Sequence, residues 1–249
     1  MSDALAIAIA AVCGGAFGHA LDVLFDRLYT DGPVVGPLVR CDQCKAGFRP
    51  AFFVPLLGPL WQRGRCPDCG RRLPLRAFLL APGCAALAAG AQPALGEFGP
   101  GLLAGAFACV FLALAFTDLE TRLIPNRVVY PSIAAAAALF WVWPELSAAE
   151  VFGGGATALL ITVLIFVFGR GAFGFGDVKM SLLMGLVVGF PSVFVGVFVG
   201  VFAAGAWVVP LLLARVLGRR DYIAYGPFIA IGAIVALFWG EDIWDWYAG

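Results

Sequence analysis

The stretch GFGDVKM, residues 174–180, places a carboxylate and an ammonium beside a strongly apolar part of the chain. TALLITVLIFVF precedes it at 157–168, and SLLMGLVVGF follows it at 181–190. Charged side chains are costly in the hydrocarbon core of a bilayer and by default mark function. The stretch therefore indicates a membrane protein in which Asp177 and Lys179 lie at the mouth of a membrane segment.

The composition of the whole chain indicates a polytopic membrane protein. Of its 249 residues, 62% are hydrophobic and only 13% are charged, with a mean hydropathy of +0.95. Ordinary soluble domains are about a quarter charged. A spanning helix requires roughly 20 mostly apolar residues. We therefore expect an all-α protein with about eight transmembrane helices, at 4–21, 77–92, 99–117, 128–143, 151–169, 178–191, 193–214 and 223–240.

The basic residues predict how these segments are oriented. Lys and Arg concentrate in cytoplasmic loops, and all 16 of them fall in alternate connections between the segments. The connections near 93–98, 144–150 and 192 carry none. This pattern predicts an even number of spans with both termini outside. The first 26 residues contain no Lys or Arg, so we expect a retained anchor rather than a cleaved signal peptide. The net charge of zero gives no indication of nucleic-acid binding.

One long stretch, residues 22–76, is not apolar and contains two C-x-x-C pairs. Cys41 and Cys44 are separated by 21 residues from Cys66 and Cys69, a spacing typical of two knuckles that share one zinc ion. Two disulfides are the alternative, but disulfides are rare in the reducing cytoplasm. A thioredoxin-like motif would explain only one pair. We therefore predict a structural zinc site, because four sulfur ligands leave no position open for catalysis.

A second charged stretch, FLALAFTDLETRLIPN at 111–126, ends another apolar segment. Under the predicted orientation, Asp118 and Asp177 both lie at cytoplasmic ends of spans, so they can approach each other at one depth. Two close carboxylates share a proton across neutral pH. One can then activate a water molecule while the other donates a hydrogen bond to the scissile carbonyl. The pair predicts an aspartyl protease.

The residues around these aspartates leave alternatives open. Gly174 and Gly176 would let an extended substrate approach Asp177 closely. Lys179 could orient Asp177, bind a substrate carboxylate or extend to the membrane surface. Each aspartate alone could be a helix cap or a solvated charge. A non-catalytic channel or assembly factor is the alternative function. A transporter would place polar groups near mid-span, whereas these charges gather at one face.

The chain resembles the bacterial type IV prepilin leader peptidases over nearly its whole length. The resemblance rests on the two cysteine pairs with LWQRGRC at 60–66, on TDLETRLIPN at 117–126, on GFGDVKM and on YGPFIAIG at 225–232. It implies an aspartyl peptidase of the bacterial inner membrane whose catalytic residues match Asp118 and Asp177. With the predicted orientation, both termini would be periplasmic.

The resemblance also implies substrates and a second activity. Members cut prepilins and pseudopilins of type IV pili and type II secretion systems, on the cytoplasmic side, after a glycine that precedes an apolar helix. Glu120 could contact the leader peptide or be a solvated charge. Long, zinc-bearing members also methylate the new N-terminus with S-adenosylmethionine. The expected parts are a first transmembrane helix (1–21), a methyltransferase-associated zinc domain (22–76) and a peptidase domain (77–249).

Two departures from the family pattern concern the neighbourhood to which methylation has been tied. His19 stands where the family usually has Asn, and it could be a cofactor contact, a substrate contact or a packed side chain. After the second cysteine pair, Arg76 is retained but the usual Glu is missing. The peptidase residues are intact, so the expectation of cleavage is stronger than that of methylation.

Overall fold

A computed structural model describes residues 2–29, 65, 68–70, 76–143, 146–168, 174–216 and 223–249. The described part forms eight α-helices and one short 3-10 helix, which confirms the expected all-α fold. The helices are α1 (Asp3–Tyr29), α3 (Arg76–Leu95), α4 (Phe98–Thr121), α5 (Asn126–Ala138), η2 (Phe140–Val142), α6 (Ala148–Phe168), α7 (Phe175–Val188), α8 (Val193–Leu213) and α9 (Gly226–Ala248).

Six of these helices, α1, α3, α4, α6, α8 and α9, are long and apolar enough to cross a membrane. The other two expected spans correspond to α5 and α7, which have only 13 and 14 residues. At 1.5 Å per residue, each is about 20 Å long and shorter than the hydrocarbon core. Helix α7 ends early because Gly189 adopts a positive φ of 77° and is followed closely by Pro191.

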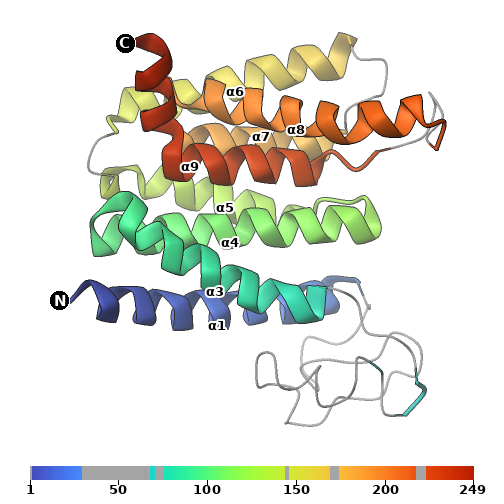
Figure 1. Cartoon of the computed structure of the whole chain (residues 1–249), viewed down its shortest axis with the longest axis horizontal. Coiled ribbons are helices and arrows are strands. Elements are labelled where there is room, and N and C mark those ends of the chain that lie inside the picture. The colour runs from blue at the N-terminus through green and yellow to red at the C-terminus, as the bar shows by residue number, and fades with distance from the viewer. Residues whose placement is uncertain are drawn as a thin grey trace.

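The helices form a bundle in which both termini lie at the same end (Figure 1). Helix α1 packs on α3, α3 packs on α4, and α9 contacts both α4 and α7. Short α7 also packs on α5 and α6, and ten of its 14 residues are buried. Large apolar side chains of α6 and α8 are exposed, as expected for faces that contact lipid.

Glycines allow helices around α7 to approach each other closely. A Cβ atom on Gly154 of α6 would lie 2.5 Å from the carbonyl oxygen of Gly185 in α7. Gly196 of α8 and Gly232 of α9 make a similar contact. Small residues at helix crossings permit such approach in membranes. The packing of α6 on α7, and of α8 on α9, therefore depends on these glycines.

The predicted zinc site lies almost entirely outside the described residues. Cys41, Cys44 and Cys66 are not among them, whereas Cys69 is described and exposed. Within the described ranges, no cluster of His, Cys, Asp and Glu could hold a metal. The zinc site and the domain limits at 21 and 76 stay predictions. Helix α1 itself continues past residue 21 to Tyr29.

Candidate active site

Asp118 lies in the last turn of α4, and only 5% of its surface is exposed. Its Oδ2 accepts a hydrogen bond of 2.9 Å from the backbone N–H of Gly226. Gly226 is the first residue of α9, so the carboxylate lies at a helix N-terminus, where the helix dipole favours negative charge.

Local hydrogen bonds and a left-handed residue end helix α4 shortly after Asp118. Arg122 adopts a left-handed conformation with φ 56°, and its N–H donates to the carbonyl of Asp118 at 2.9 Å. The hydroxyl groups of Thr117 and Thr121 donate to carbonyls one turn earlier. Pro125 then precedes α5. The helix therefore stops at a defined residue, which places Asp118 at the edge of the bundle.

Asp177 lies in the first turn of α7, outside the six spanning helices, and it is 9% exposed. Its Oδ2 accepts a hydrogen bond of 2.9 Å from the N–H of Gly174, so it also caps α7. Burial raises the pKa of Asp177 to about 6; the Gly174 N–H lowers this pKa, and the Asp118 carboxylate raises it. The two carboxylates are therefore within electrostatic reach of each other.

Tyr225 is a neighbour of Asp177 that the sequence reasoning did not select as a site residue. Burial raises the pKa of its phenol, and the charge of Asp177 raises it further. Tyr225 directly precedes Gly226, so the start of α9 contributes one group beside each aspartate. The sequence signal was YGPFIAIG, which was recognised only as a family motif. Helix α9 is thus the third element of the candidate site.

Gly174 and Gly176, the two glycines beside Asp177, both have structural roles. Gly174 is the N-cap residue of α7. A Cβ on Gly176 would lie 3.1 Å from the Cβ of Ile124, so the absence of a side chain admits the loop between α4 and α5. Substrate contact by Gly174 and Gly176 stays a prediction.

Lys179 is directed toward α5. Its Nζ donates a hydrogen bond of 2.6 Å to Oδ1 of Asn126. The ammonium also lies over the rings of Tyr130 and Phe175, at 5.2 and 4.7 Å from their centroids, which are favourable cation–π distances. These contacts tie α5 to the start of α7. A role for Lys179 in substrate binding stays a prediction.

Glu120 is partly exposed and belongs to an ion cluster. Its Oε2 lies 3.5 Å from Nε of Arg76, and the same Nε lies 3.2 Å from Oδ1 of Asp22. His19, one turn before Asp22 on α1, is half-buried and interacts electrostatically with Asp22. Sequence reasoning selected Glu120, Arg76 and His19 separately but missed Asp22, because only tertiary packing brings the three helices together.

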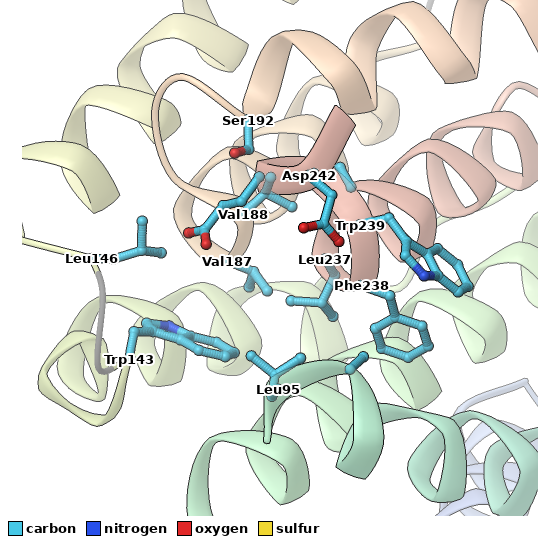
Figure 2. A pocket seen from close by; sticks show the side chains of 14 residues that line it. Leu95, Trp143, Leu146, Val187, Val188, Ser192, Leu237, Phe238, Trp239 and Asp242 are labelled. Carbon is cyan, nitrogen blue, oxygen red and sulfur yellow. The ribbon is translucent and has the colours of Figure 1, made fainter. Parts of the chain in front are cut away.

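A cavity, drawn in Figure 2, lies at the opposite end of the bundle. Its volume is about 150 Å³. Its lining residues include Leu95, just before the start of α4, and Val188, the last residue of α7. Asp118 and Asp177 lie at the other ends of these same helices, α4 and α7. Trp143 and Asp242 also line this cavity. It is therefore separate from the candidate active site.

Comparison with known proteins places the chain among the leader peptidases. The model of the type IV leader peptidase family matches residues 105–209, and that of the bacterial peptidase A24 N-terminal domain matches residues 12–91. A prepilin leader peptidase/N-methyltransferase of Burkholderia pseudomallei (strain K96243) is 30% identical over 217 residues, which are 84% of this chain and 69% of the relative. The chain belongs to the type IV leader peptidase family.

Two further relatives of this chain are also named prepilin leader peptidase/N-methyltransferase. Those of Bacillus subtilis (strain 168) and Aeromonas hydrophila are both 28% identical to it. The alignments cover 86% of both chains in the first case, and 85% of this chain and 74% of the relative in the second. No solved structure matches the chain. With its six apolar helices, the leader peptidase is a multi-pass protein of the bacterial inner membrane.

Proposed function

We propose that this leader peptidase cleaves prepilins or pseudopilins at the cytoplasmic membrane interface, with Asp118 and Asp177 as the catalytic pair. The observation that carries the proposal is the pair itself. Two buried carboxylates from α4 and α7 lie within electrostatic reach at one end of the bundle, beside the start of α9. The names of the relatives give the substrate class.

The pair can hydrolyse a peptide by general acid–base catalysis. The ionised aspartate takes a proton from water, which attacks the scissile carbonyl, while the protonated aspartate donates a hydrogen bond to the carbonyl oxygen. The tetrahedral intermediate then collapses, and the departing amine takes a proton from the pair. Burial favours a shared proton because it disfavours two charges. Burial raises the pKa of Asp177 to about 6, so a minor fraction of Asp177 keeps its proton at neutral pH.

An apolar cavity beside the start of α9 suggests where the substrate helix lies. Tyr225, a neighbour of Asp177, is one of its lining residues. The cavity is small, about 30 Å³. We propose that it belongs to the groove along which the apolar helix of a prepilin packs while its cleavage site reaches the aspartates. The lining residues come from α6, α7, α8 and α9 and include Ile161, Thr162, Ser181, Met184, Gly200, Val201 and Ile229.

A bulky side chain at the groove is expected to weaken substrate binding. Val201 lines the cavity and is 51% exposed, whereas Val209, also on α8 and 51% exposed, does not line it. We expect Val201→Trp to raise KM for a full-length prepilin about tenfold with kcat nearly unchanged, because it blocks binding rather than chemistry. Val209→Trp is the matched control. Equal KM values for the two variants would contradict the proposed groove.

We also propose that Cys41, Cys44, Cys66 and Cys69 hold one structural zinc ion. Four thiolates form a closed tetrahedral site, which would stabilise a segment with little apolar core of its own. Native mass spectrometry of the purified protein should find one zinc per chain, and Cys66→Ser should lose it. A metal-free protein in which both cysteine pairs are oxidised would contradict the zinc site and the cytoplasmic placement of this segment.

Methyl transfer from S-adenosylmethionine is proposed from the names of the relatives, which include N-methyltransferase. The cavity beside Tyr225 is too small for this cofactor, and the two cavities lined by Asp242 lie at the opposite end of the bundle. The segment to which the methyl transfer is assigned, 22–76, lies largely outside the described residues. We therefore assign no residue contact to the cofactor.

A further inference from the structure

The ion cluster of Asp22, Arg76 and Glu120 joins three helices close to the candidate active site. Asp22 comes from α1, Arg76 is the first residue of α3, and Glu120 lies in the last turn of α4. The Arg76 side chain is only 7% exposed, and that of Asp22 is 9% exposed. A guanidinium group is taken out of water only where its charge is compensated. The two carboxylates supply that compensation here.

Nothing within the first turn of α3 favours an arginine at position 76. A cation at a helix N-terminus is opposed by the helix dipole, which favours negative charge there. The first turn of α3 contains no acidic residue that would offset it. The partners of Arg76 instead lie on two other helices. Its role is therefore in tertiary structure.

Glu120 and Asp118 hold the end of α4 from two sides. They are two residues apart, which in an α-helix places their side chains on roughly opposite faces. The Asp118 side faces Gly226 of α9, and the Glu120 side faces Arg76 of α3. Beyond Thr121 the helix ends. If the Arg76 contact is lost, the last turn of α4 loses its Glu120 contact with α3.

We infer that Arg76 and Glu120 are positioning residues for Asp118, with Asp22 compensating the second side of the Arg76 charge. This inference rests on the proposed function, because it concerns the geometry of the proposed catalytic pair. The cluster also connects the two parts matched by separate family models. Asp22 and Arg76 lie within residues 12–91, and Glu120 lies within residues 105–209. The part of the chain at residues 12–91 thus helps to position Asp118, a member of the proposed catalytic pair.

The test measures kcat and KM of the full-length protein on a prepilin, together with the melting temperature of each variant. We expect Glu120→Gln and Arg76→Gln each to lower kcat about tenfold while KM changes less than about twofold, because misplacement of a reacting group acts on the chemical step. The double variant should be about as slow as either single variant, since both remove the same interaction. Glu97→Gln and Arg127→Gln, at exposed positions, are the controls.

A conservative variant separates positioning from simple stabilisation. Arg76→Lys keeps a cation beside Asp22 and Glu120 and should hold kcat within about threefold of wild type, whereas Arg76→Glu should be slower than Arg76→Gln. The inference is overturned if Glu120→Gln keeps the wild-type kcat and only the melting temperature falls, or if Arg76→Lys is as slow as Arg76→Gln. Glu120, with 28% of its side chain exposed, provides this test even if Arg76 variants do not fold.

Asp118→Asn in the same assay distinguishes failure of the proposed peptidase function from failure of the positioning role. If the wild-type protein is no faster than Asp118→Asn, the proposed function itself fails. If wild type is fast and Glu120→Gln is equally fast, only the positioning role fails.

Discussion

Asp118→Asn and Asp177→Asn are each expected to abolish leader cleavage, with kcat lowered at least about a thousandfold. The proposed reaction needs one carboxylate that accepts a proton and one that donates it, and an amide can do neither. Asparagine retains an oxygen that can accept the N–H of Gly226 or of Gly174. We therefore expect both variants to fold, so the loss would be chemical.

The measurement for these variants is cleavage of a co-expressed prepilin and of a purified one, followed by mass spectrometry. Asp242→Asn is the control, because Asp242 is exposed and lies at the opposite end of the bundle. Both active-site variants should show the melting temperature of a folded protein. If either one processes substrate at near the wild-type rate, the assignment of the catalytic pair is wrong.

Gly226→Ala is expected to lower kcat about a hundredfold, although it changes no charged group. A Cβ at this position would lie 2.7 Å from Oδ2 and 3.0 Å from Cγ of Asp118. These distances are too short, so either the carboxylate or the start of α9 must move. Alanine keeps the backbone N–H that donates to Asp118, so the variant tests the close approach alone. A displacement of about 1 Å at a reacting group can cost this much in rate.

Gly99→Ala is the matched control for this prediction. Gly99 lies in the first turn of α4, as Gly226 does in α9, and a Cβ there would meet nothing within 4 Å. The two variants should differ in kcat on a prepilin, measured beside their melting temperatures. Equal and near wild-type rates would show that Asp118 does not depend on the start of α9.

The sequence was sufficient to predict the aspartates and the helices that carry them. Asp118 and Asp177 could be selected because carboxylates at the ends of apolar segments are costly and therefore informative. The lengths of α5 and α7 were less predictable, because hydropathy does not show where a helix ends inside a bundle. Those ends depend on local features such as the positive φ of Gly189.

The partners of the aspartates could not be predicted from the sequence. Gly226 is 108 residues away from Asp118, and no local pattern relates the two. Asp22 likewise meets Arg76 only because α1 packs on α3. Gly176 was expected to leave room for a substrate, and its missing side chain leaves room for Ile124 of the same chain. Substrate contact at this position stays a prediction.

The most direct test of the account is the mass of the products of one reaction. The detergent-purified protein is incubated with S-adenosylmethionine and a peptide that spans a prepilin leader junction. We expect cleavage after the leader glycine, with the product one methyl group heavier if methyl transfer also operates. A peptide that remains uncut, together with a cognate prepilin that remains whole on co-expression, would contradict the proposed peptidase and favour a non-catalytic membrane component.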